Sequence, residues 1–568
     1  MSFLKNFVKN QQSLNRIAKI GQRWFRARKA GYPDWGVLVK NSYGQWQAAL
    51  KTAQGGPKVL IATSTGGRLP VNIMESLLSV ALTWRRAEVH VLLCDKLLPA
   101  CLECEINWYP RVAGFAKHGP VRDLCRDCFW PAQAMYQALG LQVQRYSELV
   151  SPEEKAMVAQ LAETLSVAEI AAFTWDGLAI GEHALAGALR FFARGTLDGE
   201  PYSESILRRY FQASLLTTYA LARLLEQIHY DCAVFHHGIY VPQGLVGEVA
   251  RQKRVRVVNW NPAYHKKCFI FSHGDTYHHT LMNEPVEKWE NLPMTKVMET
   301  ELMEYLQSRW YGTNDWIWFH EKPQFDLTSI ARETGVDFTK PCIGLLTNVV
   351  WDAQLHYPAN AFPNIIDWMV KTITYFNKRP DLQLLIRVHP AEIRGTLPSR
   401  QRMVDEINQA FPELPPNIFV IPPESQVSTY AAMQQCNAVI IFGTKTGVEL
   451  TSMGIPVIVA GEAWIRNKGL TLDASSVEEY FQLLDRLPLA GRLDDATLRR
   501  ARLYAYHFFF QRMIPVKIME SAKGIVTYQP RLNELGDLSP GKDPGIDLIC
   551  DGILLNKDFI YSPPGANH

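Results

Sequence analysis

A series of short apolar segments between residues 342 and 459, separated by segments of helical pattern, constrains the fold more than any other feature of this sequence. Strands that are apolar along their whole length and joined through helices form parallel sheets covered on both faces. The second half of the chain is therefore predicted to be a Rossmann-like α/β domain. Its strands are expected at 342–347, 382–388, 418–421, 438–442 and 456–459, with helices near 361–377, 400–411, 427–434 and 446–453.

The first half of the chain opens with a similar pattern. An apolar run at 58–63 leads through the turn Ser64-Thr65-Gly66-Gly67 into a helical segment and a second apolar run at 88–93. This order is a Rossmann-type opening, although the turn lacks the full G-x-G-x-x-G pattern of dinucleotide sites. Gly66 and Gly67 therefore either approach a ligand at the start of the helix or simply form the turn. Further strands are expected at 232–235, 255–259 and 269–271.

At 568 residues the chain is long enough for several domains. We expect two Rossmann-type parallel-sheet domains that face a cleft, where ligands commonly bind. The predicted parts are a basic amphipathic helix at 1–40, a first Rossmann-like domain at 41–290 with a cysteine-rich insertion at 94–130, a helical linker at 291–325, a second Rossmann-like domain at 326–500, and a C-terminal helix with an irregular tail at 501–568.

The charge of the chain is nearly balanced as a whole and uneven along its length. Fifty-nine basic residues against 56 acidic ones give a net charge of +3, which argues against a protein that wraps nucleic acid. Residues 2–30 nevertheless carry eight basic residues and no acidic one, interleaved with apolar residues. This segment is predicted either to lie on an anionic membrane surface or to pack on the body of the protein. With no apolar run of 18 residues and no secretory signal, we expect a cytoplasmic protein, peripheral at most on the inner membrane face.

The motif Arg387-Val388-His389-Pro390 stands where a predicted buried strand ends. In parallel sheets the carboxyl ends of the strands face the ligand crevice, so polar residues here are placed to act. The proline disfavours helical geometry at His389 and helps to fix where its ring points. The imidazole is expected either to bind a phosphate or a developing negative charge, or to be a hydrogen-bonded core histidine.

The next two strand ends carry polar residues as well. Ser425 follows one of them, and Gly443-Thr444-Lys445-Thr446-Gly447 follows the other and opens a helix that contains Glu449. Backbone N–H groups and hydroxyls at such a helix start form an anion cradle suited to a phosphate, and Glu449 would reach a ribose. The alternative is that Thr444 caps the helix and Glu449 complements its dipole. Three polar strand ends in succession favour the nucleotide site.

The Arg387 to Pro390 strand end, the Gly443 to Leu450 helix start, the Met453 to Val457 turn and the Gly461 to Thr471 segment together resemble the donor half of GT-B glycosyltransferases. Within them the chain is most similar to the capsule polysaccharide biosynthesis group, which includes Kdo-transferase-like enzymes. The resemblance covers about residues 342–480 in detail and 58–275 in architecture only. It implies that His389, Thr444 and Thr446 hold the nucleotide phosphate and that Glu449 binds the nucleoside. The predicted donor site comprises Arg387, His389, Ser425, Gly443, Thr444, Thr446, Gly447 and Glu449.

The resemblance implies a glycosyltransferase that moves a sugar from a nucleotide-activated donor to a surface or capsular polysaccharide, free or lipid-linked. The sequence contains no Asp-x-Asp motif, so cationic groups rather than a metal ion are expected to stabilise the leaving group. Two alternatives remain at this point. One is a nucleotide-sugar epimerase or polyol-phosphate transferase on the same fold, and the other is a non-catalytic nucleotide-binding regulatory protein.

The acceptor is then expected on the first domain. His236, His237 and Tyr240 follow the predicted strand 232–235, and Gly66 and Gly67 form the other loop on this side. Because imidazole titrates near neutrality, one of the two histidines is a candidate base for the acceptor hydroxyl. A hydrogen-bonded pair that shapes the loop is the alternative reading. Asp95, after the strand 88–93, is the rival base.

Five of the ten cysteines lie between positions 94 and 128. Cys101 and Cys104 form one C-x-x-C pair, and Cys125 and Cys128 form a second one after twenty residues. Paired knuckles at this spacing predict four thiolate ligands of a structural zinc ion, with an iron–sulfur cluster as the alternative metal group. Buried free thiols and a redox dithiol are the alternatives without a metal.

Overall fold

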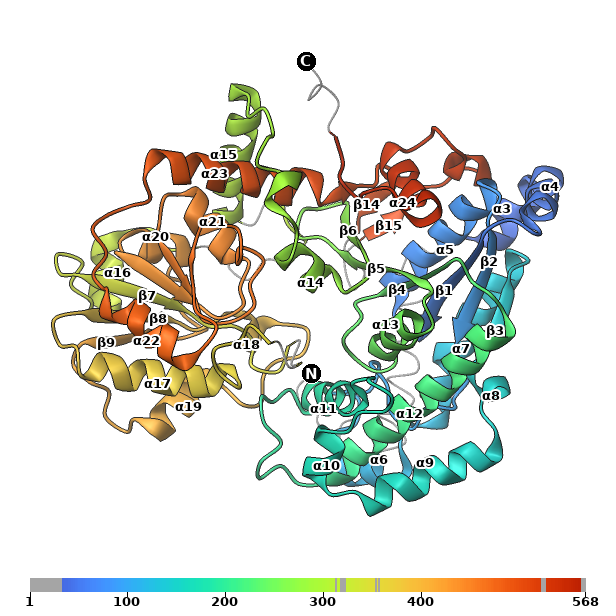
Figure 1. Ribbon diagram of the computed structural model, residues 1–568, viewed down its shortest axis with the longest axis horizontal. Coiled ribbons are helices and arrows are strands. Elements are labelled where there is room, and N and C mark those ends of the chain that lie inside the picture. Colours follow the sequence, from blue (N-terminus) through green and yellow to red (C-terminus); the bar gives the residue numbers. More distant parts are fainter. Residues whose placement is uncertain are drawn as a thin grey trace, which may run out of the picture.

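The computed structural model describes residues 33–311, 314–316, 323–352, 355, 358–522 and 528–562. The basic segment 2–30, predicted to form an amphipathic helix, lies outside the described residues. Figure 1 shows two lobes side by side, one built mainly from the first half of the chain and the other from the second half.

The first lobe is built on a seven-stranded sheet of order β13-β6-β5-β4-β1-β2-β3. Five neighbouring strands, β5 to β3 in that order, pair in parallel, as predicted. The other two add antiparallel pairs at one edge, because β5 and β6 are joined by a short turn instead of a helical crossover. The strands are β1 Lys58–Ser64, β2 Glu88–Leu93, β3 Gln142–Arg145, β4 Cys232–His236, β5 Arg256–Pro262, β6 Cys268–His273 and β13 Ile514–Pro515.

Helices cover both faces of this sheet. The long apolar helix α5 (Leu69–Trp84) packs on one face, and α12 (Ser203–Gln227) and α13 (Gln243–Gln252) pack on the other. The remaining helices of this lobe are α3 Trp35–Asn41, α4 Tyr43–Ala53, α6 Val112–His118, α7 Arg122–Ala138, α8 Tyr146–Leu149, α9 Pro152–Thr164, α10 Val167–Ala171, α11 Ile180–Phe192 and α14 Tyr277–Met282.

The second lobe contains a six-stranded sheet of order β12-β11-β10-β7-β8-β9 in which every pair is parallel. Its first five strands lie where the apolar runs predicted them. They are β7 Cys342–Leu346, β8 Gln383–Arg387, β9 Ile418–Ile421, β10 Ala438–Ile441 and β11 Val457–Val459, followed by β12 Leu472–Asp473. The covering helices are α16 Leu327–Thr334, α17 Ile365–Asn377, α18 Ala391–Arg394, α19 Met403–Ala410, α20 Thr429–Gln434, α21 Thr446–Ser452 and α22 Val477–Asp485.

The lobes are connected twice. The chain leaves the first lobe through η1 (Val286–Lys288) and α15 (Lys296–Tyr311), and returns through α23 (Asp495–Tyr506) and η2 (His507–Gln511). Figure 1 shows α23 running from the second lobe toward the first. The returning chain then adds β13 to the edge of the first sheet.

The tail beyond residue 510 is more regular than predicted. It forms β14 (Met519–Ser521), β15 (Tyr528–Pro530), η3 (Leu535–Leu538) and α24 (Pro544–Leu555). Asp543 caps α24, and Ile546, Ile549 and Ile553 lie on one face of it and pack in the same core as α5. This i, i+3, i+7 spacing is typical of an amphipathic helix, although prolines and glycines surround it. Within the described ranges, every helix is too short or too polar to span a bilayer.

Candidate functional site

A cavity of about 690 Å³ opens between the two lobes. Most of its wall comes from loops that follow β7, β8 and β10, because parallel strands present their carboxyl ends at one edge of a sheet. The first lobe closes the other side. The side chains used below that line the cavity are Tyr264, Tyr277, His278, Arg309, Asp315, Thr347, Asp352, Arg387, His389, Arg394, Gly443, Thr444, Lys445, Thr446 and Glu462.

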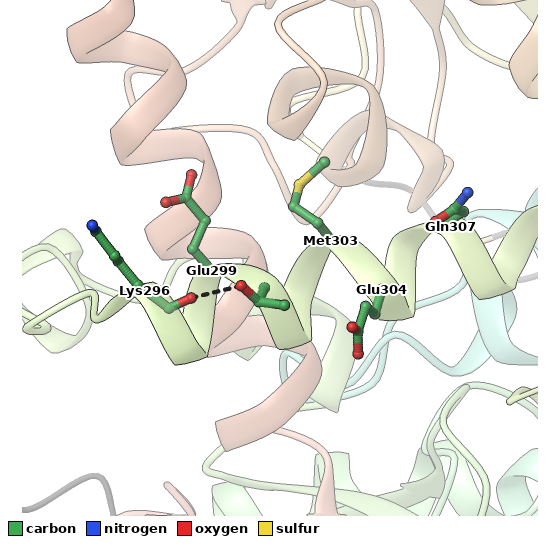
Figure 2. Close-up of a pocket in the computed structure, with 6 residues that line it drawn as sticks. Lys296, Glu299, Met303, Glu304 and Gln307 are labelled. Atoms are coloured by element: carbon green, nitrogen blue, oxygen red, sulfur yellow. Dashed lines mark hydrogen bonds between the residues drawn. The ribbon is translucent and has the colours of Figure 1, made fainter.

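A second hollow, of about 450 Å³, runs along one side of α15. Figure 2 shows that its labelled residues, Lys296, Glu299, Met303, Glu304 and Gln307, all project from this helix. A hollow lined by one helix lacks the convergent polar groups of a substrate site. The cavity between the lobes is therefore the candidate site.

His389 lies in the cavity wall with its ring held by the backbone. The backbone N–H of His389 donates to Thr347 Oγ1 (3.0 Å). The ring Nδ1 accepts a hydrogen bond from the backbone N–H of Ala391 (3.1 Å). A neutral ring whose Nδ1 accepts must carry its proton on Nε2. His389 thus lines the cavity, and a hydrogen bond to its Nδ1 fixes the ring.

Arg387 and Ser425 form hydrogen bonds that hold the loop after β9 in place beside the cavity. The Arg387 guanidinium donates to the Ser425 carbonyl (3.2 Å) and to Thr429 Oγ1 (3.4 Å), and burial lowers its pKa to about 10. The hydroxyl of Ser425 donates to Glu333 (2.7 Å) and is not part of the cavity wall. Arg387 therefore joins β8 to the loop after β9 while one side of it lines the cavity.

The loop after β10 contributes Gly443, Thr444, Lys445 and Thr446 to the cavity wall. The hydroxyl oxygens of Thr444 and Thr446 are 3.2 Å apart, so both face the same space. Gly447 does not line the cavity and instead allows close packing, since a Cβ there would lie 2.7 Å from Ile441 Cδ1. The predicted hydroxyl pair is brought together with His389 in one cavity.

Glu449 is completely buried and does not line the cavity. Its carboxylate accepts hydrogen bonds from Arg309 Nε (2.9 Å), Lys445 Nζ (2.9 Å) and the hydroxyl of Tyr430. Burial would raise its pKa, but the two cations hold the pKa of this carboxyl below its usual range. In this arrangement Glu449 anchors a buried charge network and its oxygens are already engaged.

Arg309 and Asp315 line the cavity but were not among the residues selected from the sequence. They pair with each other, and Arg309 also pairs with Glu449. They lie at the end of α15 and just after it, in a stretch predicted only as linking helices. No local pattern signals them, because what joins them to the second lobe is the contact of Arg309 with Glu449, 140 residues away in the chain.

His236 and His237 lie at the end of β4, outside the cavity wall. Their Nδ1 atoms are buried and have no hydrogen-bond partner among the described residues. Burial, with help from Arg68 and Arg190, lowers the pKa of His237 to about 3. A ring with so low a pKa is a weak base at neutral pH. His237 packs against Tyr240, with ring centroids 5.0 Å apart.

The other predicted residues of the first lobe have structural contacts. Asp95 accepts hydrogen bonds from the backbone N–H (3.0 Å) and the hydroxyl of Ser147. A Cβ on Gly66 would lie 2.2 Å from the Cys128 carbonyl oxygen, and one on Gly67 would lie 2.9 Å from Glu103 Oε2. Both glycines therefore permit close packing of the turn on its neighbours. None of these residues lines the cavity.

Tyr240 connects the lobes. Its hydroxyl donates to Asp352 Oδ1 (2.9 Å) in the loop after β7, and Leu355 of the same loop packs against the small apolar cluster that contains Tyr240. Tyr240 was predicted for the acceptor side, and the structure places it next to the cavity through this hydrogen bond. Asp352 itself was not predicted, since nothing in its local sequence marks it.

The cysteine-rich segment gives no support to the zinc or iron–sulfur prediction. Among the described residues no three or more His, Cys, Asp or Glu side chains form a group that could hold a metal ion. Cys101 and Cys104 have their sulfurs 3.9 Å apart, whereas Cys125 and Cys128 project from α7. Burial raises the pKa of Cys104 and Cys128 well above the usual thiol value. No role is assigned to a metal at Cys101, Cys104, Cys125 and Cys128.

His279 forms an ionic contact between the lobes beside the cavity. Its Nδ1 is 3.1 Å from Asp275 Oδ2, and its Nε2 is 3.3 Å from Glu462 Oε2 of the second lobe. Asp275 also lies 3.7 Å from Arg251. Burial alone would lower the pKa of His279, but the two carboxylates raise it to about 9.

We expect this contact to make stability depend on pH. Because the folded pKa lies above the unfolded value of about 6.5, the contribution is complete below pH 6.5 and is lost as the pH rises through 9. Thermal unfolding of the wild type and His279→Gln should therefore differ most in mildly acidic buffer and converge toward pH 9. A constant difference across this range would contradict the assignment.

Residues 345–501 match the family model described as "Capsule polysaccharide biosynthesis protein". This match confirms the resemblance predicted from the strand-end motifs. No curated protein sequence matches the chain.

Among solved structures, the chain is similar to the beta Kdo 2,4 transferase of Thermosulfurimonas dismutans KpsC, with 13% identity over 49% of this chain and 79% of that chain and a TM-score of 0.33. The beta Kdo 2,7 transferase of the same KpsC gives 10% identity over 56% and 88%, with a TM-score of 0.30. A UDP-GlcNAc 2-epimerase from Neisseria meningitidis gives 10% over 78% and 97%, with a TM-score of 0.24. These likenesses are distant, and no activity follows from them.

Proposed function

Because residues 345–501 match the family model of capsule polysaccharide biosynthesis proteins, we propose that this chain is a GT-B glycosyltransferase that moves a sugar from a nucleotide-activated donor to a surface or capsular polysaccharide. The observation that carries the proposal is the cavity between the lobes, where His389 from the end of β8 and Thr444 and Thr446 from the end of β10 converge on either side of β7. The second lobe would bind the donor and the first lobe the acceptor.

The cavity wall contains the groups that departure of a nucleotide requires. His389 Nε2–H, the two threonine hydroxyls and the ammonium of Lys445 would donate hydrogen bonds to phosphate oxygens, and Arg394 adds a second cation. Preorganised donors of this kind stabilise the charge that develops on the leaving group. We propose that these groups perform this task without a metal ion.

We further propose that the acceptor is presented at the inner membrane face, in free or lipid-linked form. The support for this is the basic, acid-free segment 2–30, whose composition suits an anionic lipid surface. Closure of the two lobes over the cavity would keep water from hydrolysing the donor.

The proposal can be tested with the purified protein and a panel of UDP-, GDP-, dTDP- and CMP-sugars. At least one of them is expected to raise the melting temperature, since ligand that binds only the folded state stabilises it. The same compound is expected to release free nucleotide slowly, with water as the acceptor. Interconversion of the sugar without nucleotide release would identify an epimerase instead, and the absence of any stabilisation would contradict a nucleotide-dependent function.

A further inference from the structure

We propose that the acceptor of this transferase is an uncharged pyranose sugar, and that it binds against an aromatic wall formed by Tyr264, Tyr277 and Trp464. This inference rests on the proposed function and names the chemical class of its acceptor. The sequence placed the acceptor at the loops after β1 and β4, whereas the aromatic wall lies further along the chain.

The three residues of the aromatic wall come from separate elements and lie together in the cavity. Tyr264 follows β5, Tyr277 begins α14, and Trp464 lies in the loop after β11. The ring centroid of Trp464 is 5.8 Å from that of Tyr264 and 6.0 Å from that of Tyr277. The C–H groups on one face of a pyranose ring are apolar and slightly positive, so they pack on the negative faces of aromatic rings. Neighbouring aromatic rings in a cavity therefore suit a sugar ring.

Tryptophan side chains add hydrogen-bond donors to this cavity. Trp464 is only 6% exposed, and its indole Nε1 has no hydrogen-bond partner among the described residues. The indole nitrogens of Trp316 and Trp351, which line the same cavity, have none there either. A buried donor without an acceptor costs free energy, so it calls for an explanation. The hydroxyl and ring oxygens of a sugar would supply the acceptors.

The first lobe contributes uncharged groups to the cavity. Within the described ranges, its lining residues are Tyr264, Tyr277 and His278. Burial, with help from His279, lowers the pKa of the His278 imidazole to about 4, so this ring is neutral at pH 7. Burial also raises the pKa of both phenols above the usual range, which keeps them neutral. Along this described side, the carboxylate of an acidic sugar would be buried without a compensating charge.

Two cations approach the aromatic wall, and both are paired with carboxylates. The Arg309 guanidinium carbon lies 5.9 Å from the ring centroid of Tyr264, and Lys445 Nζ lies 4.6 Å from it. Both cations bind the buried carboxylate of Glu449, and Arg309 also pairs with Asp315. The cavity thus has a charged side on the second lobe, suited to phosphate, and a neutral aromatic side, suited to a sugar.

The first test measures sugar binding directly, without a nucleotide. Saturation-transfer difference NMR on the full chain uses methyl glycosides of galactose, glucose and N-acetylglucosamine as neutral probes, and those of glucuronic acid and N-acetylneuraminic acid as acidic probes. At least one neutral probe is expected to bind, with the largest saturation on the C–H protons of one ring face. The acidic probes are expected to bind at least about 10-fold more weakly, because their charge would be buried uncompensated.

The second test asks whether the bound sugar is the acceptor. With the nucleotide sugar that stabilises the wild type in the panel above, the neutral probe that binds is expected to accelerate nucleotide release over the rate with water alone. Mass spectrometry should detect the probe extended by one sugar. The acidic probes should leave the rate unchanged.

Substitutions at Trp464 locate the sugar on the wall. Trp464→Phe keeps an aromatic ring and removes the N–H, so the dissociation constant for the neutral probe is expected to rise about 5-fold, the usual effect of one lost hydrogen bond. Trp464→Ala also removes the ring and should raise it about 30-fold. A cooperative thermal transition shows that each variant is folded. If Trp464→Ala does not fold, the conservative Trp464→Phe decides the test alone.

The matched control is Trp289→Phe. Trp289 is fully buried and its indole N–H also has no partner among the described residues, but it does not line the cavity. This variant should bind the neutral probe as the wild type does. It therefore separates the general effect of losing a buried indole from the loss of a sugar contact.

Four results would overturn the inference. They are equal or tighter binding of the acidic probes, no binding of any neutral probe, wild-type affinity for the neutral probe in Trp464→Phe, and a bound neutral probe that does not accelerate nucleotide release. A wild type that binds a neutral probe but is stabilised by no donor would instead contradict the proposed function. The two failures are therefore distinguishable.

Discussion

Replacing His389 with alanine is expected to reduce nucleotide release from the donor by about 100- to 1,000-fold, the usual cost of losing one preorganised donor to a leaving group. The ring lies in the cavity wall with Nδ1 bound to the N–H of Ala391, which leaves the proton on Nε2. Nucleotide release and the donor-induced thermal shift, measured in parallel, separate lost catalysis from lost binding.

His389→Asn sharpens this prediction. An asparagine oxygen can accept the Ala391 N–H in place of Nδ1, as asparagine commonly does two residues before a backbone donor, but it cannot replace Nε2. We expect this variant to unfold at the wild-type temperature and to be as inactive as His389→Ala. His229→Ala, at an exposed position outside the cavity wall, should behave as the wild type. Near-normal release by His389→Asn would remove Nε2 from the mechanism.

Glu449→Gln is expected to cost about 3–5 kcal/mol of unfolding free energy, the usual effect of removing one partner from a buried ion pair. Glu449 is fully buried between Arg309 and Lys445, and a neutral amide leaves both cations undercompensated. Denaturant unfolding followed by tryptophan fluorescence measures the change.

Glu478→Gln is the control for this substitution. Glu478 is also a first-turn acid of a helix, α22, but it is exposed, so it reports the contribution of the helix dipole alone. A stable Glu449→Gln protein that no longer responds to the donor would favour the nucleoside-binding role that the resemblance implied. An unstable protein that still responds to the donor would favour the network described above.

Much of the second lobe could be predicted from the sequence, because its strands are apolar along their length and each ends in a recognisable polar loop. Parallel pairing alone brings the ends of β7, β8 and β10 to one edge. This is why His389, Thr444 and Thr446 were predicted for one site and line one cavity.

The roles of individual side chains within that site were harder to predict. Ser425 stands in the right loop, but its hydroxyl is bound by Glu333, which is 92 residues away in the chain. Gly447 also stands in the right loop, but it packs against Ile441 and does not line the cavity. Asp352 and Arg309 could not be found at all from local patterns. They reach the cavity through contacts with Tyr240 and Glu449, at separations of more than a hundred residues.

The return of the chain to the first lobe also has a consequence for synthesis on the ribosome. The edge strand β13 completes the sheet of the first lobe, and β14, β15, η3 and α24 complete its core, whereas the other elements of this lobe precede residue 290. The second lobe lies between these two parts in the sequence and contains all the strands of its own sheet, so it can fold as soon as it leaves the ribosome. The first lobe cannot bury all of its apolar surface until residues 514–555 have been synthesised. The half of the protein that is translated first is therefore expected to finish folding last.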